Sequence, residues 1–364
     1  MSWIGLRDGS EGVLNPAGLG QPNLANAPDP DTLLTSGTLF IECSYEPGPL
    51  PVNILRLFAR DPWPSGLTLC LDTDGTLRLL MRHGARHLSR DLATDLQVSE
   101  SVLQISYTWD CPARRGTLTL YVPDRGTLFQ TDVSAPFPLT LRDATRLMAD
   151  HTLCKADPSL HFAAVSDSVE PAGPMPAIGA RGSIKTPSGE TPIDTLRPGE
   201  FVSTAQGDVA QVRWVGSQVL PARGRFAPCL LRAPYHGASA DLLLGRDQRI
   251  CLSGSDVEYL FGEECVSAAM RHMIDHRAVL AIDPAPQTVR YYHVLLDRHA
   301  VIIVNGAPLE SFDVSALLAD PGVLPHSVLR DLPPELRPLQ SDLALPVLRG
   351  FEALTLTELA TAQG

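Results

Sequence analysis

The sequence predicts an all-β chain, and three observations lead to that fold class. Proline accounts for 32 of the 364 residues, and proline ends helices but fits turns and strand edges. Apolar and polar residues alternate over Val102–Trp109 and again over Leu118–Val122, as in antiparallel strands. A turn-like segment, Asp72–Gly75, separates the apolar stretches Thr68–Leu71 and Thr76–Leu80. Strands joined by short turns, without intervening helices, favour a β-sandwich of the jelly-roll type.

The chain is long for one compact domain and comfortable for two. Changes in composition set the expected boundaries, which are an irregular lead-in at 1–36, a β-sandwich at 37–165, a linker at 166–176, a second all-β domain at 177–315 and a tail at 316–364. We expect the tail to pack on the second domain, with a strand or a short helix within Leu343–Leu359.

The charge balance excludes some classes of partner. Asp and Glu outnumber Lys and Arg by 41 to 29, so the net charge is -12. Such a chain would repel nucleic acid and anionic membranes. Residues 1–12 lack a basic segment followed by an apolar run, and no apolar stretch reaches membrane-spanning length. The expected location is the cytoplasm, with leaderless secretion as the alternative.

The seven cysteines are scattered, odd in number and free of any C-x-x-C pair. This pattern fits neither a disulfide framework nor a zinc ribbon. We therefore expect buried thiols.

Four blocks in the second half carry a family resemblance. They are Ile184–Val202 with its T-P-x-G-E turn, Val212–Gly216, Asp241–Leu252, and Tyr292–Phe312. In this order and spacing they resemble bacterial Hint domains of the hedgehog/intein superfamily, which implies a horseshoe-like all-β fold over 177–315. Within the fourth block, Asn305-Gly306 predicts a type I′ hairpin turn.

The resemblance implies a self-processing site, and the sequence departs from it at two positions. The family's Cys or Ser nucleophile aligns with Ala177, or with Ile178 in a shifted register. The family's T-x-x-H segment, whose His protonates the departing amide, ends here in Gln248, which cannot be a general acid near pH 7. No His-Asn pair closes the domain. His293 and His299 remain of the family set, and we expect them to form a structural cluster with Asp297.

We therefore predict a Hint-type domain that has lost autocatalysis, within a non-catalytic binding or interaction protein. The alternative is an autoproteolytic protein that cleaves near Pro176-Ala177, with Ser183 as a displaced nucleophile.

The first half resembles concanavalin A-like (laminin-G-like) lectin domains. Gly37–Glu42 matches their opening strand and Leu160–Val165 a closing one. The resemblance implies a carbohydrate or protein ligand bound by the sandwich.

For the other residues that could bind a metal or an anion, a structural role is the simpler interpretation in each case. His272 and His276 share a helical face without a third ligand, His83 and His87 lie in an Arg-rich hairpin that could bind an anion, and Asp72 and Asp74 suit a turn as well as calcium. A sugar-active enzyme would need facing carboxylates, and nothing pairs Glu42 with Asp72 or Asp74. We predict no metal and no cofactor.

Overall fold

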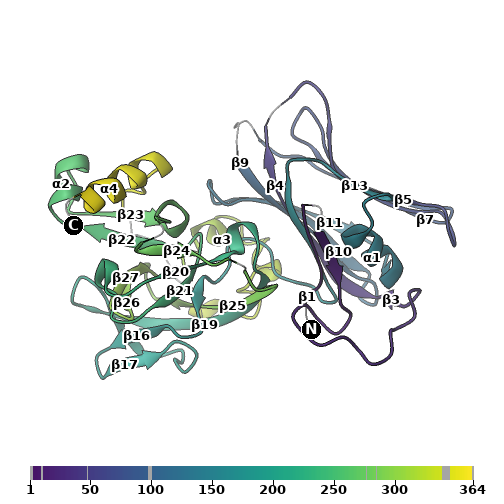
Figure 1. Ribbon diagram of the computed structural model, residues 1–364. Helices are drawn as coiled ribbons and strands as arrows, with labels where there is room; N and C mark the ends of the chain where they lie inside the picture. The colour runs from purple at the N-terminus through teal and green to yellow at the C-terminus, as the bar shows by residue number, and fades with distance from the viewer. Residues whose placement is uncertain are drawn as a thin grey trace. The chain divides into compact units, whose positions relative to one another are not determined.

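The computed structural model describes residues 3–9, 11–46, 48–96, 101–275, 277–283, 285–337 and 345–362. The chain forms two compact units, Met1–Pro174 with Asp320–Ser327, and Met175–Ala319 with Val328–Gly364. Both units are built from antiparallel sheets, so the predicted all-β class is confirmed (Figure 1). Among the described residues, no helix has the length and apolar character to cross a membrane.

The first unit is a β-sandwich. One sheet has the strand order β11-β10-β9-β4-β14-β1-β2 and the other the order β13-β5-β6-β7-β8, with a small β12-β3 pair beside them. The strands are β1 (Trp3–Asp8), β2 (Glu11–Leu14), β3 (Leu33–Leu34), β4 (Ser36–Tyr45), β5 (Val52–Ala59), β6 (Ser65–Leu71), β7 (Leu77–His83), β8 (Arg86–Leu92), β9 (Ser101–Asp110), β10 (Arg115–Val122), β11 (Thr127–Ser134), β12 (Leu139–Thr140), β13 (Cys154–Ala156) and β14 (Leu160–Ser166). Helix α1 (Leu141–Ala149) begins at Thr140, whose hydroxyl accepts from the Asp143 backbone N–H.

The predicted strand patterns are found in this unit. Leu103, Ile105, Tyr107 and Trp109 of β9 all point into the core between the sheets and are fully buried. The predicted hairpin joins β6 to β7, and Gly75 takes a positive φ of 83° at its turn. The opposite face of β9 is also buried, so this strand is not half exposed as the alternation suggested.

One expectation about the ends of this unit was wrong, and the expected linker is ordered where it begins. Residues 1–36 are not wholly irregular, because β1 pairs with β14 and β2 and buries Trp3, Ile4 and Leu6. The start of the expected linker at 166–176 is fixed, since the Thr38 hydroxyl donates to the Ser168 carbonyl and accepts from the Glu170 backbone N–H. Such partners lie more than a hundred residues away, so local composition does not reveal them.

The second unit also contains two sheets. Their strand orders are β18-β19-β25-β15-β21-β20-β24 and β17-β16-β26-β27-β22-β23. The strands are β15 (Ile178–Gly179), β16 (Ser183–Thr186), β17 (Gly189–Pro192), β18 (Phe201–Ser203), β19 (Val209–Pro221), β20 (Pro228–Leu231), β21 (Leu242–Gly245), β22 (Arg249–Ser253), β23 (Cys265–Ala269), β24 (Val279–Ala281), β25 (Thr288–Leu296), β26 (Val301–Val304) and β27 (Ala307–Glu310). The predicted type I′ turn joins β26 to β27, with φ of 44° at Asn305 and 81° at Gly306.

Helices occupy little of the second unit. They are α2 (Ser255–Phe261), α3 (Ser315–Ala319) and α4 (Gly350–Ala362), with short 3-10 turns at Gly224–Phe226, Tyr235–Gly237, Met270–His272 and Pro334–Leu336. Helix α4 lies beside α2 (Figure 1) and contributes Ala353 and Leu356 to the core. The expected tail therefore has two parts, because Asp320–Ser327, with its 3-10 turn Leu324–His326, belongs to the first unit instead.

Candidate functional site

The position of the expected nucleophile lies between two strands in the second unit. Ile178 of β15 pairs with Tyr292 of β25 on one side and with Leu244 of β21 on the other. Ala177 directly precedes β15 and lies beside Gly245 of β21. The Gly245 backbone N–H donates to the Ala177 carbonyl at 2.7 Å. A Cβ at residue 245 would lie 3.1 Å from the Ala177 methyl, so glycine permits this close approach.

The described side chains near Ala177 are poor candidates for a nucleophile. Ala177 is 9% exposed, and Tyr291 of β25 donates its hydroxyl proton to the Phe226 carbonyl at 3.0 Å. Cys229 of β20 lies on the far side of β21, and its S–H points at the Leu244 carbonyl. Burial raises the pKa of the Cys229 thiol to about 12, so it stays protonated and unreactive at neutral pH. This cysteine is a buried thiol, as expected.

Gln248 holds the turn that precedes β22. Its backbone N–H donates to the Gly245 carbonyl, and its side-chain Nε2 donates to the carbonyls of Arg249 and Glu310, each at 3.0 Å. Both amide protons are therefore used on the backbone. Within the described residues, the buried Oε1 of Gln248 has no hydrogen-bond partner. The side chain supports the turn and carries no proton that it can release.

His293 is buried and neutral. Its Nδ1 accepts from the Val294 backbone N–H at 3.0 Å, and its ring packs 5.1 Å from the ring of Phe312. Burial, together with the charge of His299, lowers the pKa of His293 from 6.5 to about 3. At neutral pH the imidazole is therefore uncharged, with its proton on Nε2, and cannot act as a general acid.

His299 belongs to a buried network centred on Glu310. Its Nδ1 lies 3.0 Å from the Ser311 hydroxyl and its Nε2 lies 3.3 Å from a Glu310 carboxylate oxygen. The Ser267 hydroxyl donates to the other carboxylate oxygen, and Arg249 lies 3.4 Å from the carboxylate. Burial raises the pKa of Glu310, but the bonds from His299 and Ser267 and the charge of Arg249 outweigh it and lower the pKa overall.

The expected cluster of His293, His299 and Asp297 is thus wrong in one member. Asp297 accepts from the Gln211 backbone N–H at 3.1 Å, which ties the end of β25 to β19. Glu310 takes the place assigned to Asp297. The sequence carried a signal for it, because Glu310-Ser311 stands in the fourth family-like block.

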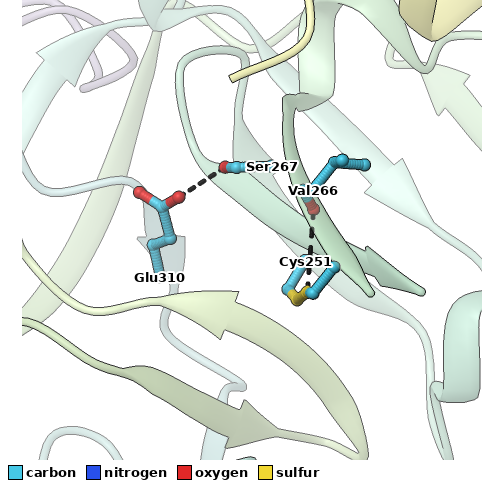
Figure 2. The surroundings of a disulfide bond; sticks show 5 residues. Cys251, Val266, Ser267 and Glu310 are labelled. Carbon is cyan, nitrogen blue, oxygen red and sulfur yellow. Dashed lines mark hydrogen bonds between the residues drawn. A yellow bond between two sulfur atoms is a disulfide. The ribbon is translucent and has the colours of Figure 1, made fainter. Parts of the chain in front are cut away.

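A disulfide joins Cys251 of β22 to Cys265 of β23, next to this network (Figure 2). Ser267, the donor to Glu310, pairs with Cys251 in the strand register. The expectation of seven thiols was therefore wrong for this pair, and Cys43, Cys70, Cys111, Cys154 and Cys229 are free. Nothing in the spacing marks the bond, because only the pairing of β22 with β23 brings these two side chains together.

The remaining candidates have structural partners. Asp74 accepts from the Thr76 backbone N–H, which lowers its pKa, and Asp72 pairs with Arg78 at 3.2 Å, so both serve the hairpin turn. Ser183 is a strand residue whose N–H donates to the Asn305 side chain. His276 lies outside the described residues, and within those described no group of three or more His, Cys, Asp or Glu side chains is placed to hold a metal ion.

His83 is part of an aromatic cluster on the first unit. Its ring lies 5.8 Å from Trp63 and 6.2 Å from Phe137, and the Arg86 guanidinium lies 4.9 Å over the Phe137 ring. We call Trp63, His83, Phe137 and Arg86 the aromatic cluster. A small hollow beside it is lined by polar groups that include Ser65, Arg82 and Asp143. His87 pairs with Arg82 across the β7–β8 hairpin.

Comparison with known proteins accords with the geometry of the second unit. Residues 178–316 match the family of Hint domains. The second unit contains a Hint domain. Its fold is similar to that of the MchDnaB-1 intein, at 13% identity and a TM-score of 0.25 over 37% of this chain and all of that one. The Msm DnaB1 intein splicing domain bound with zinc is also similar, at 15% identity and a TM-score of 0.23 over 36% and 98%.

The first unit is similar to another solved structure. This is the CBM40 of the Ruminococcus gnavus IT-sialidase bound to α2,6 sialyllactose, at 10% identity and a TM-score of 0.27 over 36% of this chain and 77% of that one. No curated protein matches the chain.

Proposed function

We propose that the Hint domain does not process itself and serves as an inert scaffold in a binding protein. The observation that carries this proposal is the Ala177 methyl, held against Gly245 at the position where the family's nucleophile is expected. Gln248 donates the protons of its side-chain amide to two backbone carbonyls, and the His293 imidazole is neutral at neutral pH. The site therefore lacks an attacking group and an acid to protonate the departing nitrogen.

The intact mass of the purified protein, followed through a long incubation with a thiol, tests this proposal. We expect one species of full length throughout. A matched pair of variants gives the positive control: Ala177→Cys supplies a nucleophile alone, and Ala177→Cys with Gln248→His also supplies the acid. We expect thiol-dependent cleavage before residue 177 to be faster in the double variant, by roughly 100-fold if the acid acts. Cleavage of the unaltered chain at Ala177 would overturn the proposal and favour the autoproteolytic alternative.

We also propose that the sandwich binds a carbohydrate at the aromatic cluster. The Trp63 side chain is 37% exposed although it is large and apolar, and it continues into the rings of His83 and Phe137. Aromatic faces fit the apolar faces of sugar rings, and the Arg82 side chain beside them lines the adjoining hollow.

Glycan binding by the whole chain, measured with Trp63→Ala, tests the site. Phe58 is a suitable control because it is an exposed aromatic residue of the same unit, 43% accessible, with Arg60 over its ring. We expect Trp63→Ala to weaken binding about 10-fold or more and Phe58→Ala to leave it unchanged. Equal losses in both variants, or binding to proteins but to no glycan, would contradict the proposal.

The disulfide bears on where the protein works. We infer an oxidising compartment, as in the leaderless-secretion alternative, because disulfides persist there and are rare in the cytosol. Alkylation of the denatured protein from its native host, without reductant, checks this inference. Modification of five cysteines is expected, whereas modification of all seven would place the protein in a reducing compartment.

A further inference from the structure

Three side chains of the first unit form a serine–histidine–carboxylate relay that the proposed function does not use. The Ser44 hydroxyl lies 2.6 Å from His161 Nε2, and His161 Nδ1 lies 3.2 Å from a Glu42 carboxylate oxygen. We propose that Ser44 is an activated nucleophile that accepts the acyl group of activated esters.

The strand geometry explains how the three groups meet. Glu42 and Ser44 are two residues apart on β4, so they lie on the same face of the sheet. His161 lies on the neighbouring strand β14, where Leu160 pairs with Cys43 and Phe162 with Glu42. His161 is therefore the extra residue of a β-bulge, and a bulge redirects its side chain. The bulge places the imidazole between the two β4 side chains.

The direction of each hydrogen bond follows from which of the three groups can donate a proton. The Glu42 carboxylate can only accept, and its second oxygen already accepts from Gln104 Nε2 at 3.1 Å. His161 must therefore donate to Glu42 through Nδ1–H. In the neutral ring, Nε2 then carries a lone pair and accepts the proton of the Ser44 hydroxyl. This is the tautomer that a general base needs in order to activate a serine.

The carboxylate is buried, whereas the histidine and the serine are partly exposed. Glu42 is 1% exposed, whereas the His161 side chain is 36% exposed and Ser44 is partly exposed. The orienting group is thus held in the interior and the nucleophile is at the accessible end, which is the arrangement a substrate requires.

The reaction balances without a further reactant except water. Ser44 Oγ attacks the ester carbonyl carbon, and its proton passes to His161 Nε2. The bond to the leaving oxygen breaks, and that oxygen takes the proton, which leaves an acyl-Ser44. Water then attacks the acyl group by the same proton route and releases a carboxylic acid and the free serine.

The backbone around Ser44 limits the substrate class. The Ser44 N–H donates to the Ser159 carbonyl at 2.9 Å, so it is not available to the oxygen of the tetrahedral intermediate. Each missing donor of this kind costs roughly 100- to 1000-fold in rate. Aryl esters, whose leaving groups need little help, are therefore the expected substrates.

Labelling of the full chain with a fluorophosphonate probe, followed by peptide mapping, tests the proposal. The hydroxyl displaces fluoride from phosphorus, so the adduct marks the reactive serine. We expect an adduct on Ser44 in the native protein and none after denaturation. Ser44→Ala should abolish it, and Ser36→Ala should not, since Ser36 lies on the same strand but bonds to the Asp167 carbonyl.

A second variant separates an activated serine from an exposed one. His161→Gln keeps a polar side chain at a partly exposed position but removes the base, and we expect labelling and p-nitrophenyl acetate hydrolysis to fall roughly 100-fold. Absence of an adduct on Ser44 in the native protein, or an unchanged rate in a folded His161→Gln variant, would overturn the proposal.

Discussion

Each unit contains a cluster of one glutamate, one histidine and one or two serines. We call them the Glu42 cluster, in the first unit, and the Glu310 cluster, in the second, and they differ in access to solvent. In the second unit the His299 and Glu310 side chains are each 6% exposed, and Ser311 is buried. In the first unit the Glu42 side chain is 1% exposed, but His161 is 36% exposed. Arg249 adds a positive charge to the Glu310 cluster.

The comparison shows that the same residue types serve different purposes in different surroundings. The Glu310 cluster ties β27 to β22 and β23 and leaves no hydroxyl within reach of a substrate. The Glu42 cluster orients a histidine towards an accessible serine. We therefore expect changes to the Glu310 cluster to act mainly on stability and changes to the Glu42 cluster to act mainly on reactivity.

The largest expected effect is the response of the second unit to acid. The folded pKa of His293, about 3, lies below its ordinary value of 6.5, so the unfolded chain binds more protons between these values. The free energy of unfolding should therefore fall as pH drops from 6.5 towards 3, with a slope approaching about 1.4 kcal/mol per pH unit. The lowered pKa of Glu310 acts in the same direction below pH 4.5.

Hydrogen exchange read peptide by peptide, at pH values from 7 to 4, measures this response in each unit. His293→Asn is a suitable control because its side-chain oxygen can still accept from the Val294 N–H but does not titrate in this range. We expect the variant to flatten the slope above pH 4.5. An unchanged slope would assign the acid sensitivity to other groups.

Removal of the disulfide should have the next largest effect. The bond closes a loop between residues 14 apart in sequence, and cross-links of this span contribute about 3 kcal/mol, mainly by restricting the unfolded chain. Paired replacement of Cys251 and Cys265 by Ala should lower the urea midpoint of the second unit and leave that of the first unchanged. Equal losses in both units would contradict a local effect of the disulfide on the second unit.

Removal of charge from each glutamate gives the smallest effect and the most direct comparison. Glu310→Gln breaks bonds to a charged network in the interior, and we expect a loss of about 2 kcal/mol in unfolding free energy. Glu42→Gln keeps a polar partner for Gln104 and should cost about 1 kcal/mol, while labelling of Ser44 falls because the His161 tautomer is no longer fixed. Urea unfolding and probe labelling of both variants measure the two effects. A larger loss of labelling in Glu310→Gln would reverse the comparison.

Local patterns predicted the strands well where neighbours in sequence are also neighbours in space. The β6–β7 hairpin and the Asn305-Gly306 turn follow from residues that meet within a few positions. The expectation failed at β1, whose partner strand β14 lies over 150 positions away, in register from Trp3 with Ser166 to Asp8 with Phe162. The expected tail at 316–364 was wrong at Asp320–Ser327 for the same reason, because the place of this segment in the first unit depends on contacts with residues far away in the sequence.

At the candidate site, too, local patterns predicted some features and long-range contacts decided the others. The block order predicted the Hint domain, which the family match confirms. The assignment of Ala177 and Gln248 to the catalytic positions follows from the same blocks and stays a prediction. The partners of Glu310 could not be read from the blocks, because Arg249 on β22 and Ser267 on β23 come close to β27 only through the sheet. Asp297 was the natural choice from spacing, but the end of β25 directs its carboxylate to Gln211.

The sequence by itself determined the all-β class, the Hint family of the second unit and the absence of a nucleophile at residue 177, because these depend on periodicity, block order and residue identity. Only the tertiary structure decided which side chains meet: Cys251 with Cys265, Glu310 with His299, and Ser44 with His161 and Glu42. The physical reason is strand register. A shift of one residue turns a side chain to the other face of a sheet, and a single bulge at His161 decides what it touches.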